Sequence, residues 1–530
     1  MRIDCRYAPI LTVIVSFVLY FLNPYGLSAD EAHYFLWSRN LDFAYYSKGP
    51  LAALSIWVSC SIFGHGEHFV RLPALLYSWG SMYILWRMIF KREGPSNYAP
   101  VWGLIFGAVG LWYSMFFMTT DAPVIFFWML TFFLVSKYYQ ISSELQLSKK
   151  LGFPINRITI LLFIGISIGF GIWAKYTAVI LLPALIFSLF VRKSLFREKI
   201  LEALTLISVC LLMLFPILYW NYSNNWVNFS HNVSHGSKGF LEGKYFSPVF
   251  FLEFVASQIG LYSLFLIPIL IVLPWRSLVN SCLYLPFLKR YNSLSDSKLV
   301  NSSDFFILLS SVLLVLACVI VSFTKRVYPN WTIPAYPGLG LVLGVPALSM
   351  LSRFPRLYLF TRLITAFSVM LSFGLLLGFN YGLSGKILPT KKLAGWEDLS
   401  NKITSIRESS GDMPWPVFTE SYGLASQILY YDKKRYGEVY SVPIGNRRMN
   451  QFDIWNKQRN VFEKLAGLDI LIVLSPDTAV EELNNYFDNI EIFHQYPESY
   501  FLYSGTRLRD VRFYIGRNFS GQAFPDPVHY

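Results

Sequence analysis

Long apolar runs recur through the first 380 residues, and they constrain the fold more than any other feature of this sequence. A helix needs about 20 predominantly apolar residues to cross the hydrocarbon core of a bilayer. About eleven runs meet this condition. They centre near residues 8–23, 70–90, 100–118, 122–139, 158–174, 176–191, 200–220, 250–274, 304–323, 331–350 and 357–379. The sequence therefore predicts a polytopic α-helical membrane protein.

The composition supports a membrane protein and argues against other classes. Hydrophobic residues make up 54% of the chain and charged residues 15%, whereas a soluble domain has about 25% charged residues. The net charge of +13 comes from Lys and Arg between apolar runs, not from the basic stripe that a nucleic-acid-binding protein carries. The five cysteines are scattered, so they predict neither a zinc site nor a disulfide framework.

The distribution of Lys and Arg predicts the orientation of the chain. Cytoplasmic loops of membrane proteins carry an excess of these residues. With a cytoplasmic N-terminus, the clusters at 2–6, 91–92, 149–157, 192–199, 289–290 and 353–362 all fall inside, and the C-terminal region falls outside. A cleavable signal peptide ending near Leu27-Ser28-Ala29 is the alternative interpretation of the first run.

The composition becomes mixed and polar after about residue 380. Leu471–Leu474 has the pattern of a buried strand, and Thr478–Phe487 has that of a helix. We therefore expect two domains. Residues 1–380 form the transmembrane domain, with a first outer loop at 24–70, and residues 381–530 form a small extracytoplasmic α/β domain.

Acidic residues at the outer face are the first candidate functional groups. Ser28-Ala29-Asp30-Glu31 is typical of a helix start, where Asp30 and Glu31 would suit the helix dipole. Asp121 lies at the outer end of the third and fourth runs, and Pro123 follows it. A carboxylate at membrane depth indicates a functional site. Simple helix capping is the alternative for all three acids.

Several basic residues lie on the same outer face, although Lys and Arg are usually enriched on the cytoplasmic side. They are His33, Lys48, Arg71, Lys175, Lys325 and Arg326. Binding of an anionic lipid headgroup explains such residues, and a lipid-linked phosphate is the natural ligand. Snorkelling of long side chains to the interface is the alternative for Arg71 and Lys175.

The outer loop at 221–248 contains two histidines at helical spacing. His231 and His235 could lie on one helix face as metal ligands, but no Glu completes a metalloprotease motif. A polar loop without metal is the favoured interpretation.

Several segments together resemble the polyprenyl-phosphate-sugar-dependent glycosyltransferases of the GT-C superfamily, namely family 39 and the related aminoarabinose transferases. The bacterial branch, which acts on envelope lipids, is the more similar one. The matching segments are 29–38, 41–51, 63–72, 120–123, 220–226, 235–236, 325–331 and 445–455.

The resemblance implies a GT-C fold and specific roles for single residues. The resemblance implies that Asp30 is the catalytic carboxylate of the first outer loop. Asp121 would support the same site, and Glu31 stands beside Asp30. Lys48 stands where the family often has a basic residue, although Gly49 replaces the usual proline. The substrate-binding candidates are Tyr34, Tyr46, His235, Asn330 and Trp331.

We therefore expect an inverting glycosyltransferase in the bacterial inner membrane. Its donor would be a sugar on undecaprenyl or another polyprenyl phosphate, held by Lys48 and Arg71 with one or more of His33, Lys175, Lys325 and Arg326. Its acceptor would be a membrane glycolipid such as lipid A or lipopolysaccharide core. Protein O-mannosylation and lipid-headgroup flipping stay open as alternatives, as does a divalent metal ion on Asp30 and Asp121.

Overall fold

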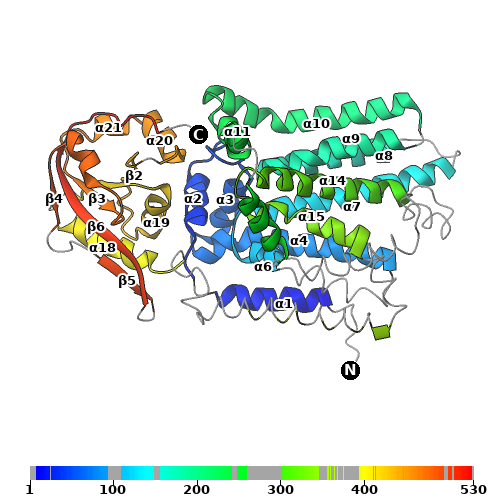
Figure 1. Cartoon of the computed structure of the whole chain (residues 1–530), viewed down its shortest axis with the longest axis horizontal. Coiled ribbons are helices and arrows are strands. Elements are labelled where there is room, and N and C mark those ends of the chain that lie inside the picture. Colours follow the sequence, from blue (N-terminus) through cyan, green and yellow to red (C-terminus); the bar gives the residue numbers. More distant parts are fainter. Residues whose placement is uncertain are drawn as a thin grey trace. The chain divides into compact units, whose positions relative to one another are not determined.

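A computed structural model gives the architecture of the chain (Figure 1). It describes residues 8–23, 25–93, 109–147, 155–192, 194–241, 247–259, 300–344, 393–409, 411, 413–445, 447–493, 499–503 and 506–527, with a few single positions between 355 and 374. Most of the predicted run at 357–379 and parts of those at 100–118, 250–274 and 331–350 lie outside the described residues.

The described contacts divide the chain into two compact units. The first unit comprises Met1–Phe21, Arg71–Tyr222 and Gly236–Leu376, and the second comprises Leu22–Val70, Ser223–His235 and Leu377–Tyr530. The predicted first outer loop, 24–70, is thus grouped with the C-terminal residues. The reason lies in the second unit, where the helix Ala29–Arg39 packs against a C-terminal helix.

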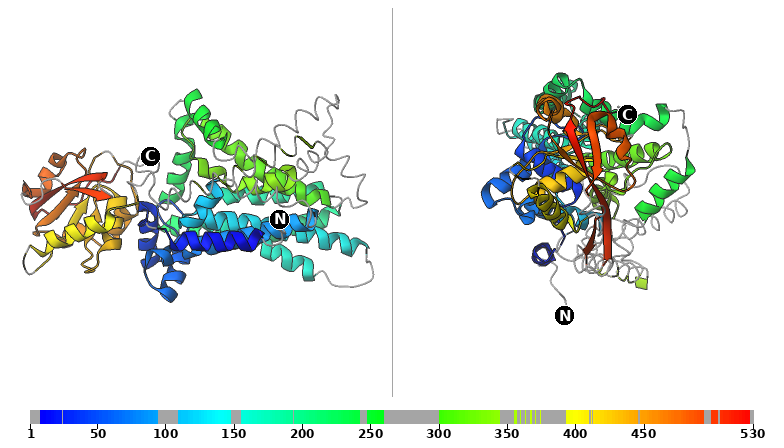
Figure 2. Two further views of the ribbon diagram at one scale, coloured as in Figure 1. Left: turned by 90° about the horizontal axis from the view of Figure 1, so that it is seen from below. Right: turned by 90° about the vertical axis from the view of Figure 1, so that its left-hand side faces the viewer.

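The first unit is helical. Its helices are α1 (Ala8–Phe21), most of α4 (Glu67–Glu93), α6 (Val109–Phe116), α7 (Asp121–Leu147), α8 (Ile155–Ala174), α9 (Leu181–Val191), most of α10 (Phe196–Ser223) and α14 (Val300–Ser322). Helices α7, α8, α9 and α14 run side by side (Figures 1 and 2). Four described helices are long and apolar enough to cross a membrane: Asp121–Ser142, Arg157–Ala174, Phe196–Ser223 and Ser302–Ser322.

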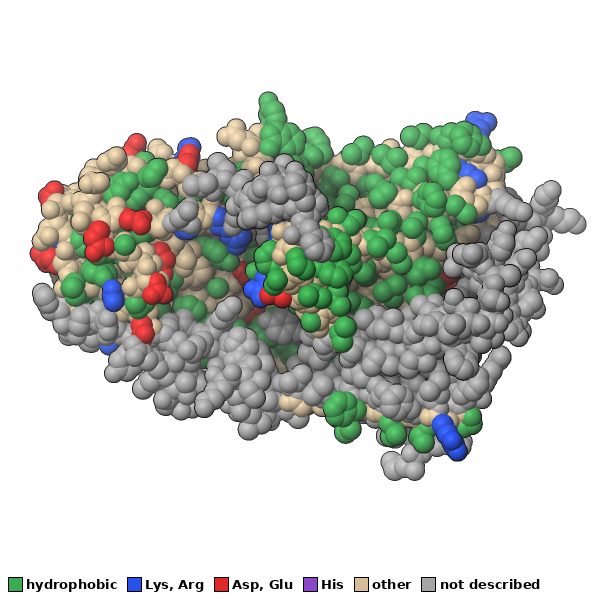
Figure 3. All heavy atoms as spheres, viewed as in Figure 1, with side chains coloured by type: hydrophobic (Ala, Val, Ile, Leu, Met, Phe, Trp, Pro, Cys, Tyr) green, Lys and Arg blue, Asp and Glu red, His purple; other side chains and the backbone are tan. Residues whose placement is uncertain are grey.

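Small residues let these helices approach closely. A Cβ atom added to Gly165 of α8 would lie 2.7 Å from Val209 of α10, so only glycine fits there. The hydroxyls of Thr131 in α7 and Ser167 in α8 lie 2.9 Å apart. Hydrophobic side chains such as Leu212, 74% exposed, cover the outer face of α10 (Figure 3). Such a surface suits contact with lipid.

Two of the predicted spans begin with irregular turns. Residues 176–191 begin with the 3₁₀ turn η2 (Tyr176–Ile180). Residues 329–344 consist of the 3₁₀ turn η3 (Pro329–Thr332), the short helix α15 (Ala335–Leu339) and the π turn η4 (Gly340–Gly344). The described part of the run predicted near 331–350 is an apolar helix from Ala335 to Gly344 that follows η3. Pro329 and Pro334 lie before α15, where their missing backbone donors prevent the helix from continuing towards the N-terminus.

The second unit combines helices with a mixed sheet of six strands. Its strands are β1 (Val417–Thr419), β2 (Val439–Ser441), β3 (Ile470–Leu474), β4 (Phe487–Ile492), β5 (Ser499–Tyr503) and β6 (Thr506–Phe519), in the order β2-β1-β3-β6-β4 with β5 on β6. Strands β1, β2 and β3 are parallel, and β6 is antiparallel to its neighbours. The strand predicted at Leu471–Leu474 is confirmed as part of β3. The helix predicted at Thr478–Phe487 is instead the 3₁₀ helix η6 (Val480–Tyr486) followed by β4.

The helices of the second unit come from distant parts of the sequence. They are α2 (Ala29–Arg39), α3 (Leu51–Phe63), α18 (Trp396–Glu408), α19 (Tyr422–Tyr431), α20 (Gln451–Gln458) and α21 (Val461–Lys464). One apolar core around Phe418, Ile472 and Phe519 holds the sheet. Helix α19 packs on both α2 and α18. The first outer loop is therefore held by C-terminal residues.

Candidate functional site

The predicted site residues belong to both units. Asp30, Glu31, His33, Tyr34, Tyr46 and Lys48 lie in the second unit; Arg71, Asp121, Lys175, Lys325, Arg326, Asn330 and Trp331 lie in the first. His235 lies in α11 (Val227–Leu241), outside the residues whose side chains are described.

The start of α2 separates its two acids. The hydroxyl of Ser28 accepts from the Glu31 amide at 3.3 Å, and Glu31 Oε2 accepts from the Ser28 amide at 2.9 Å. This capping box buries Glu31 completely. Asp30 is exposed, and its Oδ1 accepts from the Tyr422 hydroxyl at 3.0 Å. Asp30, unlike Glu31, can therefore reach a substrate.

His33 is buried in an aromatic cage. Its ring lies 4.9 Å from that of Trp37 and 5.6 Å from that of Phe452, and its Nδ1 lies 2.9 Å from the Ser426 hydroxyl. Burial lowers the pKa of His33 from 6.5 to about 3. A neutral imidazole carries no positive charge to attract a phosphate, so His33 is not part of the proposed donor site. Tyr34 is likewise buried, with its ring 4.8 Å from Trp37.

The buried His33 predicts that acid destabilises the second unit. Its pKa is lower in the folded chain than the ordinary 6.5, so the unfolded chain binds an extra proton between about pH 6.5 and 3. The free energy of unfolding should fall as the pH drops through this range, by up to about 1.4 kcal/mol per pH unit. Thermal unfolding at pH 7.5 and 5.5 should show a smaller pH dependence for His33→Asn than for wild type. Equal dependences would contradict the assignment.

The turn that carries Lys48 is fixed through its backbone. Lys48 O accepts from the Tyr45 amide at 3.0 Å and from Asn228 Nδ2 of α11 at 3.3 Å. The Tyr46 amide donates to Gln451 Oε1 at 2.7 Å. The Lys48 side chain is half-buried on this rigid turn. Sequence reasoning missed Asn228 and Gln451, because nothing local shows that they contact residues about 180 and 400 positions away.

The first unit holds a polar cluster around Asp121. Lys175 Nζ lies 2.8 Å from Asp121 Oδ1, and Asn330 Nδ2 donates to Oδ2 at 2.8 Å. The Thr119 hydroxyl lies 3.4 Å from Oδ2. The side chains of Asp121 and Lys175 are only 8% and 11% exposed. Lys175 therefore pairs with the buried carboxylate and does not snorkel to the interface.

Two irregular turns place the partners of Asp121. Lys175 is the N-cap residue of η2, directly after α8 ends at Ala174. Asn330 lies in η3, after α14. In membrane proteins, irregular backbone at membrane depth occurs where it is buried in protein or lines a cavity. The turn at Lys175 coincides with the boundary between the predicted runs 158–174 and 176–191, whereas the contacts of Lys175 and Asn330 with Asp121 were not predicted.

The remaining predicted cations differ in their surroundings. Arg71 is 1% exposed, and its guanidinium lies 5.3 Å from the ring centre of Phe117, close in sequence to Asp121. Arg326 forms an exposed ion pair with Glu253 at 2.9 Å. Lys325 and Trp331 are half-buried. The charge of Arg326 therefore already has an acidic partner at the surface.

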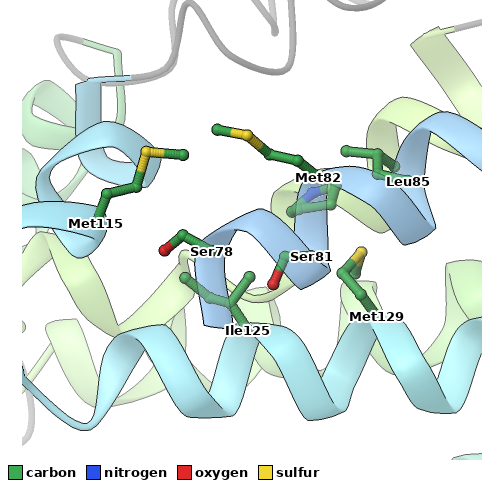
Figure 4. Close-up of a pocket in the computed structure, with 8 residues that line it drawn as sticks. Ser78, Ser81, Met82, Leu85, Met115, Ile125 and Met129 are labelled. Carbon is green, nitrogen blue, oxygen red and sulfur yellow. The ribbon is translucent and has the colours of Figure 1, made fainter. Parts of the chain in front are cut away.

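An apolar pocket in the first unit is lined in part by α7, the helix that begins at Asp121 (Figure 4). Its lining includes Met82, Met115, Ile125 and Met129. Ile125 and Met129 follow Asp121 at intervals of four residues, so the three share one helix face. The lining is apolar and rich in methionine, whose side chains adapt to irregular shapes.

Among the described residues, no three His, Cys, Asp or Glu side chains gather as metal ligands. Asp121 already accepts a hydrogen bond from both Lys175 and Asn330. His231 lies with its ring 4.7 Å from that of Tyr46. The described donor set does not fit a metal ion, and we derive no step through one.

These features define a class of protein. Apolar spanning helices, with two irregular turns beside a buried Asp–Lys pair, form a multi-pass membrane protein. Its fold is similar to that of ArnT from Cupriavidus metallidurans. The apo structure of that protein is 16% identical, with a TM-score of 0.58 over 98% of this chain and 99% of that one. The structure with undecaprenyl phosphate is 15% identical, with a TM-score of 0.60 over 99% and 100%.

Sequence comparison confirms the resemblance to GT-C glycosyltransferases. Residues 47–220 match the family model described as dolichyl-phosphate-mannose-protein mannosyltransferase. The lipid A galacturonosyltransferase RgtD of Rhizobium johnstonii is 23% identical over 261 residues, which make up 47% of this chain and 50% of that protein. The chain thus spans about half the length of this curated relative.

Proposed function

We propose that the chain is an inverting glycosyltransferase that moves a sugar from a polyprenyl phosphate to an envelope lipid. The observation that carries the proposal is the start of α2, where Glu31 is buried in the cap and Asp30 is exposed. The match to a lipid A galacturonosyltransferase supports lipid A as the acceptor class. The similar fold of ArnT, whose structure holds undecaprenyl phosphate, supports a polyprenyl-phosphate donor. The inner membrane, with the C-terminal residues on the periplasmic side, follows from this assignment.

The proposed reaction is a single displacement. Asp30 accepts the proton of an acceptor hydroxyl while the hydroxyl oxygen bonds to the anomeric carbon. The bond from that carbon to the phosphate oxygen breaks, and the polyprenyl phosphate leaves with the electron pair. The configuration at the anomeric carbon inverts because no covalent enzyme intermediate forms. Lys48 stabilises the negative charge that develops on the leaving phosphate.

The first unit supports a lipid-linked donor. The pocket beside Ile125 and Met129 is apolar and matches the chemistry of an isoprenoid chain. Asp121, Lys175 and Asn330 form a polar cluster on the same face of α7. We propose that the apolar chain of the donor lies along this face. The contributions of Arg71, Lys175 and Lys325 to phosphate binding stay predictions.

Replacing Lys48 with alanine should weaken donor binding and slow transfer together. A hydrogen bond to a charged group contributes about 1.5–3 kcal/mol, so kcat/KM for the donor should fall by about 10- to 100-fold. Steady-state kinetics with a polyprenyl-phosphate sugar measures this change. Lys433→Ala is the matched control, because Lys433 forms an exposed pair with Glu397. If the two variants behave alike, the phosphate is held elsewhere.

The acceptor class can be tested with one labelled donor. Purified chain in proteoliposomes receives a radiolabelled polyprenyl-phosphate sugar together with lipid A extract, with a protein acceptor, or with neither. Label in lipid A supports the proposal. Label in protein would instead show a protein glycosyltransferase, and movement of intact donor across the bilayer would show a flippase.

A further inference from the structure

The first residue of α19 reaches the exposed acid of α2. The Ser421 hydroxyl caps α19 by accepting from the Leu424 amide at 3.3 Å, which fixes Tyr422 at the start of the helix. The Tyr422 hydroxyl donates to Asp30 Oδ1 at 3.0 Å. Asp30 and Tyr422 are 392 positions apart in the sequence. A C-terminal side chain is therefore in direct contact with the proposed catalytic base.

The tyrosine is held as a hydrogen-bond donor. The negative charge of Asp30 raises the pKa of Tyr422 because it disfavours the phenolate, and burial of the ring raises it further. Arg448 also hydrogen-bonds the Tyr422 hydroxyl and acts in the opposite direction. The chain Arg448–Tyr422–Asp30 thus joins an exposed cation to the acid through one hydroxyl. Arg448 belongs to the 445–455 segment, one of those that carry the resemblance to GT-C glycosyltransferases.

The two helices are joined closely enough to set this geometry. His33 Nδ1 lies 2.9 Å from the Ser426 hydroxyl, and Gln427 Nε2 donates to Leu27 O at 2.7 Å. A Cβ atom added to Gly423 would lie 3.2 Å from the Ala29 side chain. Ser426 and Gln427 are fully buried. Helix α19 is therefore packed rigidly against the first turn of α2.

We propose that Tyr422 is a positioning residue for Asp30, and this proposal rests on the glycosyltransferase function proposed above. Its hydroxyl fixes Oδ1, so that Oδ2 accepts the proton of the incoming acceptor. The C-terminal residues then serve catalysis by orienting the base. Helix α19, which is distant in sequence from the 24–70 segment, would thus contribute to catalysis.

The kinetic test compares Tyr422→Phe with Tyr430→Phe. Tyr430 is the matched control, because it lies in the same helix and its hydroxyl donates to His65 O at 2.9 Å. Tyr422→Phe should lower kcat about tenfold and leave the donor KM unchanged, since one orienting hydrogen bond of about 1.4 kcal/mol is lost. Tyr430→Phe should keep the wild-type kcat.

A double-mutant cycle separates positioning from a general loss of structure. If Tyr422 acts through the carboxylate, Tyr422→Phe should lower the residual transfer of Asp30→Asn by less than twofold, because the base is already absent. A full tenfold further loss in that background would overturn the proposal. Such a loss would show that the hydroxyl supports the fold and not the acid.

A fluorine probe tests the contact without any activity measurement. 3-Fluorotyrosine placed at position 422 in the full chain should change its ¹⁹F resonance when Asp30 becomes asparagine, and not when the exposed Asp42 does. An unchanged resonance overturns the contact. A changed resonance with full activity in Tyr422→Phe overturns the positioning role, while loss of transfer in Asp30→Asn would still support the proposed function. Absence of transfer by wild type would overturn the proposed function and the inference that rests on it.

Discussion

Replacing Asp30 with asparagine is expected to lower the rate of sugar transfer by about 10²- to 10⁴-fold, the usual contribution of a general base. The amide keeps the size of the side chain but cannot accept the proton of the acceptor hydroxyl. Asp30 is exposed at the first turn of α2, so the substitution buries no unpaired group and should leave the fold intact. Single-turnover transfer from a labelled donor measures the loss.

Two controls make the Asp30 result specific. Asp42→Asn is the same change at another exposed position of the 24–70 segment, and it should retain wild-type transfer. Thermal unfolding of Asp30→Asn should match that of wild type. Transfer by Asp30→Asn within a few-fold of wild type would remove Asp30 from the mechanism.

Replacing Lys175 with methionine is expected to cost about 3–5 kcal/mol of stability. Loss of one partner from a buried ion pair leaves the other charge without compensation. Asp121 would keep its hydrogen bond from Asn330 but would lose the ammonium that lies 2.8 Å away. Chemical unfolding in detergent micelles, monitored by tryptophan fluorescence, measures the free energy of unfolding.

The Asp121–Lys175 prediction has a rescue and a matched control. Adding Asp121→Asn to Lys175→Met should recover most of the stability, because no buried charge then remains. Arg326→Gln breaks an ion pair whose side chains are 68% and 42% exposed, and it should cost about 1 kcal/mol or less. If Lys175→Met is as stable as Arg326→Gln, the pair does not hold the cluster together.

Local sequence signals predicted much of the fold. Apolar runs predicted helices at 122–139, 158–174, 200–220 and 304–323, because the bilayer sets both their length and their composition. The capping sequence at Ser28 predicted the start of α2, and the β-rich run at Leu471–Leu474 predicted β3. Each of these elements is determined by residues that are close together in sequence.

Contacts between distant residues were not predictable in the same way. Lys175 was predicted as a phosphate ligand, whereas its ammonium pairs with Asp121, 54 positions away. His33 was predicted as a cation, whereas burial keeps it neutral. No sequence period shows that Tyr422 lies against Asp30 or that Gln451 holds the turn beside Lys48.

The central claim is tested most directly by following a radiolabelled sugar from a polyprenyl phosphate, with purified wild type and Asp30→Asn side by side and lipid A as acceptor. We predict that wild type forms a labelled lipid whose anomeric configuration is inverted relative to the donor. Asp30→Asn should form less of this product by a factor of about 10² or more. Equal labelling by both proteins, or retention of the donor configuration, would contradict the account.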